Sequence, residues 1–296
     1  MDHLLRSLLG GVIVSVFLMP FAKADESPWS TQLALNYLSG IYSGDTTKDD
    51  LNAFGIKGQF NYLDTYNVNL GYSRLGIAFD SETVSDTLYQ EAFQFELERH
   101  YFVDGLNGAL TPSIQFSHID GNLSDSALGG LFYMGGALNY MNYQRDLSFD
   151  LHYSQTTYDL HSNVYQYDAA VGASLFGAEN WGQVRLYDIE SASFERHYIS
   201  ADVLIKHWLS SYSLLSPDSV YLAFTLGDRL LAVDPDTLVI ANLNQIQKQY
   251  IRVGTEWALP HRSQLMLTLA YSEYELSTFD SDYSGTFLFL QYSTKW

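Results

Sequence analysis

Apolar and polar residues alternate one by one along most of the chain that follows residue 29. In the segment LSFDLHYS, residues 147–154, every second residue is apolar and the residues between are polar or charged. A helix would repeat its apolar face every three to four residues, whereas a side-chain period of two is typical of a strand. The pattern therefore predicts β-strands.

About 14 such segments follow one another, each of roughly 9 to 13 residues, and clusters of Gly, Asp, Asn and Ser separate them. This length suits a tilted strand that crosses a membrane, which needs about 9 to 11 residues. A boundary error of a few residues merges or splits segments, so about 12 or 16 strands are alternatives. The segments begin near Gln32, Phe54, Tyr66, Tyr89, Leu110, Phe132, Leu147, Tyr165, Gln183, Tyr198, Val220, Tyr250, Leu265 and Thr286.

The N-terminus predicts a secretory signal peptide. Arg6 precedes an uncharged run at residues 8–21, and small residues follow at Ala22 and Ala24. The run is shorter than the ~20 residues that a spanning helix needs, so we expect cleavage after Ala24. Residues 25–296 would then form the mature protein.

Alternation does not by itself separate a soluble β-sandwich from a transmembrane barrel. Two further patterns favour the barrel. Connections alternate between mostly short and mostly longer, as periplasmic turns and outer loops do in such barrels. The tryptophans all fall near the same, periplasmic ends of the predicted strands, where an aromatic girdle is expected; they are Trp29, Trp181, Trp208, Trp257 and Trp296.

The chain ends in FLFLQYSTKW, in which Leu288, Leu290 and Tyr292 alternate before a terminal Trp296. This ending resembles that of Gram-negative outer-membrane β-barrel proteins of the porin-like class. The resemblance implies that these four residues form the assembly signal read by the barrel-assembly machinery. It also implies that the last strand closes the barrel against the first, and that the partners are outer-membrane lipid and lipopolysaccharide.

The net charge of −19 argues against nucleic-acid binding, and the chain has no cysteine for disulfides. Charged residues at the inward positions of the strands predict a polar lumen. Asp168, Arg185 and Asp202 lie on successive strands, so their side chains are expected to bridge neighbours. The set acts either as a structural brace or as a pore wall that sets ion preference. The predicted pore-lining residues are Lys57, Glu96, Glu98, Asp150, His152, Asp168, Arg185, Asp202, Lys206, Arg252 and Glu256, with Lys295 at the strand end.

His152 and Ser154 have the His-x-Ser spacing of outer-membrane lipid hydrolases. In those families the pair faces the lipid, whereas the alternation here gives the lipid face to Leu151 and Tyr153. The Asn-Gly that commonly follows the serine is also absent, with Gln155 in its place. We therefore interpret the pair as lumen lining and expect no catalytic residue, cofactor or metal site.

Two loop features remain. Acidic residues gather in the outer loops, and a rim of this kind would draw cations to the channel mouth. The long connection at residues 227–248 is unusually apolar and either folds inward as a constriction or extends outward as a hairpin, which we favour. The acidic loop residues include Asp45, Asp49, Asp50, Asp234, Asp236, Asp280 and Asp282.

The sequence thus predicts one closed antiparallel transmembrane β-barrel that acts as a passive channel for small solutes or ions. Two alternatives stay open: a non-conducting structural or export component of a surface assembly, and a lipid-modifying envelope enzyme.

Overall fold

The structure is a computed structural model of the chain. It describes residues 27–44, 48–79, 87–122, 130–158, 163–192, 196–210, 216–230, 233–234, 239–240, 245–276 and 282–296. The predicted signal peptide lies outside the described residues, so its cleavage stays a prediction. Within the described residues, no helix is long and apolar enough to cross a membrane.

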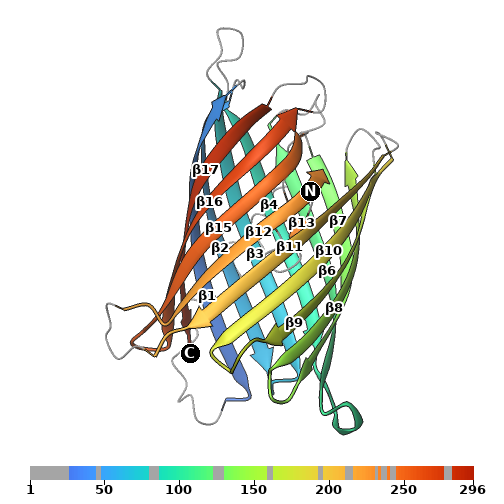
Figure 1. Cartoon of the computed structure of the whole chain (residues 1–296), viewed down its shortest axis with the longest axis vertical. Coiled ribbons are helices and arrows are strands. Elements are labelled where there is room, and N and C mark those ends of the chain that lie inside the picture. Colours follow the sequence, from blue (N-terminus) through green and yellow to red (C-terminus); the bar gives the residue numbers. More distant parts are fainter. Residues whose placement is uncertain are drawn as a thin grey trace.

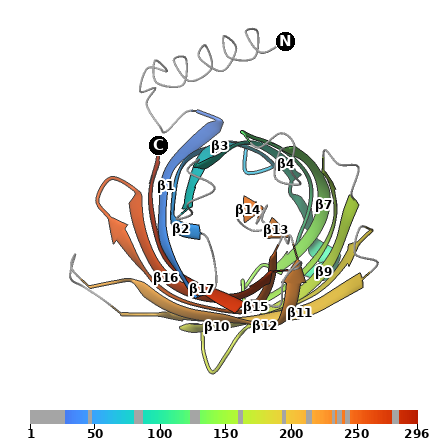
Figure 2. The same cartoon turned by 90° about the horizontal axis from the view of Figure 1, so that it is seen from above.

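Strands of one antiparallel sheet curl into a closed barrel (Figures 1 and 2). Each strand pairs with its neighbours in chain order, and β1 closes the ring by pairing with β17 from Gln32↔Lys295 to Gly44↔Tyr283. Closure pairs the backbone groups of both edge strands, which a membrane requires. The strands of the wall are β1 (Trp29–Gly44), β2 (Lys48–Tyr62), β3 (Tyr66–Phe79), β4 (Leu88–Arg99), β5 (Tyr101–Val103), β6 (Gly108–Gly121), β7 (Gly130–Asn142), β8 (Leu147–Tyr158), β9 (Asn163–Ser174), β10 (Asn180–Ser191), β11 (Arg196–Trp208), β12 (Ser219–Leu230), β15 (Gln245–Leu259), β16 (Ser263–Leu276) and β17 (Asp282–Lys295).

The short strand β5 continues β4 in the same position of the wall, so the barrel has 14 strands, as predicted. Both pair with β6 in one register, from Glu98↔Ser113 in β4 to Tyr101↔Leu110 in β5. The interruption falls opposite Pro112, whose ring leaves no N–H to donate to the ladder. A one-turn 3-10 helix, η1 (Asp104–Leu106), then leads into β6.

The two faces of the wall differ as the alternation predicts. On β8 the outward Leu151 and Tyr153 are 60% and 41% exposed, whereas the inward His152 and Ser154 are 5% and 1% exposed. The exposed apolar side chains form the outer surface, as in a barrel that faces lipid. The strands also continue into segments predicted as loops, since residues 188–191 belong to β10 and residues 196 and 197 to β11.

The described strands of the long apolar connection lie inside the barrel, contrary to the outward hairpin that we favoured. Two short strands, β13 (Val233–Asp234) and β14 (Val239–Ile240), pair with each other apart from the barrel sheet, and Figure 2 shows them inside the ring. Leu230 and Ile246, at the ends of β12 and β15 that lead into the connection, are 0% and 5% exposed within an inner apolar cluster. Burial of apolar side chains favours this inward path over exposure to water.

The tryptophans lie at the predicted end of the strands, but only some of them face outward as a girdle would require. Trp29, Trp257 and Trp296 lie at outward positions near the end of the short turns, which is the periplasmic end in such barrels. Trp181 instead packs over Gly172 on the inner face. The ammonium of Lys206, a lumen residue, lies 5.4 Å from the Trp208 ring.

Candidate functional site

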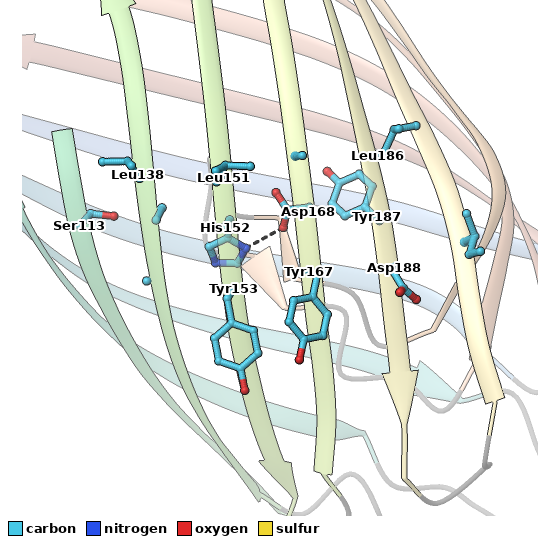
Figure 3. Close-up of a pocket in the computed structure, with 14 residues that line it drawn as sticks. Ser113, Leu138, Leu151, His152, Tyr153, Tyr167, Asp168, Leu186, Tyr187 and Asp188 are labelled. Atoms are coloured by element: carbon cyan, nitrogen blue, oxygen red, sulfur yellow. Dashed lines mark hydrogen bonds and ion pairs between the residues drawn. The ribbon is translucent and has the colours of Figure 1, made fainter. Parts of the chain in front are cut away.

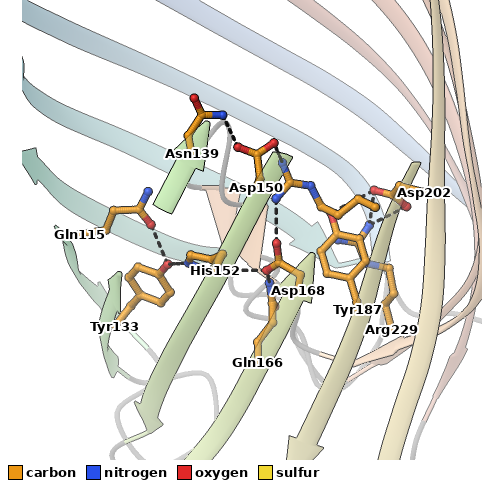
Figure 4. A network of polar contacts seen from close by, with 11 residues as sticks. Gln115, Tyr133, Asn139, Asp150, His152, Gln166, Asp168, Tyr187, Asp202 and Arg229 are labelled. Atoms are coloured by element: carbon orange, nitrogen blue, oxygen red, sulfur yellow. Dashed lines mark hydrogen bonds and ion pairs between the residues drawn. The ribbon is translucent and has the colours of Figure 1, made fainter. Parts of the chain in front are cut away.

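The candidate site is the polar inner wall of the barrel. The structure places all of the predicted pore-lining residues at inward positions, on β2, β4, β8, β9, β10, β11 and β15. Hydrogen bonds and ion pairs join most of them across neighbouring strands, and Figure 4 shows the central part of this network.

The centre of the network is His152, which lies between two strands. Its Nδ1 is 2.6 Å from Asp168 Oδ2 on β9, and its Nε2 is 2.9 Å from the Tyr133 hydroxyl on β7. The register His152↔Asp168 puts the two residues side by side on the inner face. Sequence reasoning did not single out Tyr133, although it occupies an inward position of its strand.

The contacts of Tyr133 extend the network from His152 toward β4. The Tyr133 hydroxyl donates to Gln115 Oε1 at 2.9 Å, while the Nε2 of the same amide donates to Glu96 at 2.8 Å. Tyr133 therefore connects His152 on β8 to Gln115 on β6 and, through Gln115, to Glu96 on β4.

Arg185 connects β10 to both acidic residues of this centre. Its guanidinium is 2.7 Å from Asp168 Oδ1 and 3.8 Å from Asp150 Oδ2. Asp150 also accepts a hydrogen bond from Asn139 on β7. The positive guanidinium of Arg185 thus faces two carboxylates, and its charge offsets part of the cost of burying them.

A second group surrounds Asp202 on β11. Its carboxylate accepts from the Tyr187 hydroxyl at 3.1 Å and from Thr225 at 2.5 Å, and it forms an ion pair with Arg229 at 3.2 Å. The Arg229 guanidinium stacks over the Tyr187 ring at 4.2 Å. Sequence reasoning missed Arg229, because it assigned this residue to the connection after β12.

Further pairs extend the wall in both directions. Lys206 Nζ is 2.6 Å from Glu256 Oε2, which also accepts from the Ser219 hydroxyl at 2.9 Å. On the opposite side, Glu96 and Glu98 accept hydrogen bonds from neutral amides of β3 and β6. The network therefore runs through hydrogen bonds from β3 to β10.

The outer face has a hollow of about 690 Å³ beside this network (Figure 3). Exposed apolar side chains such as Leu151, Leu186 and Ile199 surround it. An acyl chain in this hollow would not meet the hydroxyl of Ser154, which faces the lumen and is 1% exposed. The geometry therefore does not provide the lipid-facing His-x-Ser pair that a hydrolase of this kind needs.

The residues of the predicted assembly signal lie where the resemblance puts them. Leu288, Leu290 and Tyr292 are outward and 38%, 38% and 40% exposed. The backbone of Trp296 exchanges two hydrogen bonds of 2.9 Å with Thr31 of the first strand. Reading of the signal by the assembly machinery stays a prediction.

The structure describes only some of the residues of the predicted acidic rim. Asp49, Asp50 and Asp282 lie at the ends of β2 and β17 that face the long connections. Asp234 lies in β13, within the ring rather than on the rim. Asp45, Asp236 and Asp280 lie outside the described residues.

Solved structures with a similar fold are outer-membrane proteins. The Pseudomonas putida toluene transporter TodX aligns with a TM-score of 0.54 and 9% identity, covering 93% of this chain and 90% of its own. The monoaromatic hydrocarbon channel CymD gives 0.55 and 8%, with 91% and 89% covered. A bacterial polysaccharide outer membrane secretin gives 0.51 and 9%, with 90% and 98% covered.

No family model matches the sequence, and no curated protein matches it. The fold is that of porin-like outer-membrane proteins. A closed 14-strand barrel with this apolar exterior resides in the outer membrane.

Proposed function

We propose that the protein is a passive channel for small solutes or ions across the outer membrane. The observation that carries the proposal is the closed 14-strand barrel with charged and amide side chains along its inner wall. A barrel of eight strands is filled by its own side chains, whereas larger barrels enclose water. Polar side chains on the inner wall suit contact with that water.

The similar structures support a channel role. TodX is described as a toluene transporter and CymD as a monoaromatic hydrocarbon channel, so the same fold surrounds passages for small solutes. At this low identity the likeness concerns the fold alone. Which solutes this chain passes would depend on the residues of its own inner wall.

The charges of the inner wall nearly cancel, because acidic and basic side chains pair across strands. The acidic rim should then dominate the field at the mouth and draw cations toward it. We expect a weak cation preference that fades with rising salt, since the Debye length falls to about 3 Å at 1 M.

Conductance of the purified protein in planar bilayers tests the proposal. We expect discrete conductance steps and reversal potentials in a salt gradient that show cation preference. Replacement of Asp49, Asp50 and Asp282 by Asn should reduce the preference while conductance persists. An anion preference would reject the rim mechanism, and absence of conductance after verified insertion would reject the channel.

A second candidate is a non-conducting structural or export component. It is favoured by the inner apolar cluster, whose members Tyr133, Ile189 and Leu230 are all 0% exposed, together with the β13–β14 hairpin inside the ring. Both features place apolar or main-chain groups within the ring, where a conducting lumen would hold water. The same bilayer measurement separates the two functions.

A further inference from the structure

Glu96 and Glu98, two inward residues of β4, are acidic residues of the lumen wall that no basic side chain neutralises by direct contact. Within the part of the chain that the structure describes, neither of them forms a salt bridge. The other acidic lumen residues each do, as shown by Asp150 and Asp168 with Arg185, Asp202 with Arg229, and Glu256 with Lys206. Lys57 on β2 acts on Glu98 electrostatically without forming an ion pair.

The two carboxylates converge on one point. Asn69 Nδ2 lies 2.8 Å from Glu96 Oε2 and 3.2 Å from Glu98 Oε1, so a single nitrogen atom touches both groups. Asn67 Nδ2 lies 3.2 Å from Glu98 Oε2. Neutral amide hydrogens therefore occupy the place where opposite charge would stabilise two neighbouring carboxylates.

The amide oxygens of the same two asparagines lack hydrogen-bond partners. Asn67 and Asn69 are 3% and 5% exposed, and the Oδ1 atom of each is buried without a donor among the described residues. Buried acceptors are normally satisfied. Each unpartnered oxygen thus belongs to an amide whose Nδ2 contacts a carboxylate of Glu96 or Glu98.

We propose that Glu96, Glu98, Asn67 and Asn69 bind a hard divalent cation of the calcium class. A half-turn of either amide about its last torsion exchanges Oδ1 for Nδ2 and brings the unpartnered oxygen to the point where the carboxylates converge. Two carboxylates and two amide oxygens are ligands that Ca²⁺ accepts in irregular geometry, and water completes its six to eight oxygens. Glu98 is half-buried and leaves an approach from the lumen.

Sequence reasoning could not find this site. The described residues contain no group of three or more His, Cys, Asp or Glu that could hold a metal, so no acidic or histidine motif marks it. The amide ligands become neighbours of the carboxylates through the register Asn67↔Glu98 and Asn69↔Glu96. The inference concerns the wall and does not depend on whether the barrel conducts.

Calcium titration of the purified protein in detergent tests the site. Isothermal calorimetry should show saturable binding of CaCl₂, and Ca²⁺ should raise the midpoint temperature of unfolding relative to a chelator, since a ligand of the native state stabilises it. Glu98→Gln should raise the dissociation constant for Ca²⁺ by at least about tenfold, because replacement even of a residue that only supports a metal ligand lowers affinity by that much. The matched control is Glu256→Gln, a lumen carboxylate that has Lys206 as its partner, and it should bind Ca²⁺ as the wild type does.

If Glu98→Gln fails to fold, a variant that is expected to bind Ca²⁺ more tightly than the wild type tests the site instead. Asn69→Asp adds a third carboxylate at the convergence point, so it should enlarge the calcium-induced shift of the midpoint. Absence of calorimetric binding to the wild type would overturn the site. Equal calcium responses in Glu98→Gln and Glu256→Gln, or an equal shift by NaCl at matched ionic strength, would overturn it as well.

Discussion

Arg185 joins three strands of the wall through one buried guanidinium. The residue is 4% exposed and contacts Asp168 and Asp150, and the side chain of Asp168 is 0% exposed. Removal of one member of a buried ion pair costs more than the pair contributes, because the partner remains charged without compensation. Of the two alternatives that the sequence left open, the buried ion pairs support the structural brace. A role of the same side chains in ion preference stays a prediction.

We expect Arg185→Leu to lower the free energy of unfolding by about 3 to 5 kcal/mol, because Asp168 and Asp150 would lose their guanidinium. Urea unfolding in detergent micelles, followed by tryptophan fluorescence, measures the change. Arg145→Gln in the exposed β7–β8 turn is the control and should change stability by less than about 0.5 kcal/mol. Equal effects of the two substitutions would contradict the role of Arg185.

Sequence reasoning reached part of this arrangement. The Asp168–Arg185 pair followed from two inward positions on adjacent strands. For Asp202 the sequence indicated Arg185 as the partner, and the ion pair of Asp202 with Arg229 was missed because Arg229 lies beyond a bulge that carries β12 into the predicted connection. The hydrogen-bonding roles of Tyr133 and Gln115 were also missed, since uncharged residues give no signal until the register of three strands is known.

Strand β12 contains that bulge at Gly227. The backbone there has φ +91°, and a Cβ atom would lie 2.4 Å from the carbonyl oxygen of Ile199 on β11. A bulge adds a residue to one strand and bends it. The bend precedes the point where the chain turns toward the inner hairpin.

Gly227→Ala should therefore destabilise the barrel by about 1 to 3 kcal/mol, through backbone strain and the clash with β11. Urea unfolding of the purified variant measures this loss. Gly105→Ala, where a Cβ would have no neighbour within 4 Å, is the matched control and should be near neutral. A neutral Gly227→Ala would show that the bulge relaxes without cost.

Alternation along a strand predicted the faces well, because every strand of the wall separates lipid from lumen. The alternation predicted the ends of the strands less accurately than their faces. Strand β10 continues into a segment predicted as a loop at residues 188–191, and near the opposite end of the same strand Trp181 faces inward. Hydropathy does not show where a strand leaves the bilayer when its neighbours still pair with it.

A substitution that places charge on the outer face tests the assignment of faces. Leu151→Arg should destabilise the inserted barrel by about 2 to 4 kcal/mol, because the guanidinium would face hydrocarbon near the midplane. Gln59→Arg at an inward position of β2 should be tolerated. Reversible folding into lipid vesicles measures both, and similar losses in the two variants would refute the assignment.

At the scale of the molecule, closure of β1 on β17 unites the whole chain in one hydrogen-bonded ring. Removal of any one strand from the wall would break its hydrogen bonds to both neighbouring strands. The resemblance of the C-terminal segment to outer-membrane barrel proteins implied this closure. The inward position of β13 and β14 was one of two alternatives that the sequence left open, and the other was favoured, because the choice depends on the apolar interior that the completed ring creates.

We expect the mature protein to resist SDS at room temperature and to change its gel mobility after boiling, because the closed sheet pairs its backbone donors within the membrane. Comparison of heated and unheated samples measures this. A variant that lacks residues 288–296 should lose the heat-dependent shift. A mature protein that stays soluble without detergent would contradict the barrel.

The interruption of pairing opposite Pro112 makes the boundary of β4 and β5 with β6 the weakest seam of the ring. Every other boundary between wall strands is an uninterrupted ladder or contains a bulge, whereas the boundary of β4 and β5 with β6 skips the positions of Arg99 and His100. Breathing of the wall should therefore begin at this seam, near the periplasmic end. In deuterium exchange, the amides that flank Pro112 should acquire label before those of the β1–β17 junction. The boundary that joins the two ends of the chain would then be more stable than one between strands adjacent in sequence.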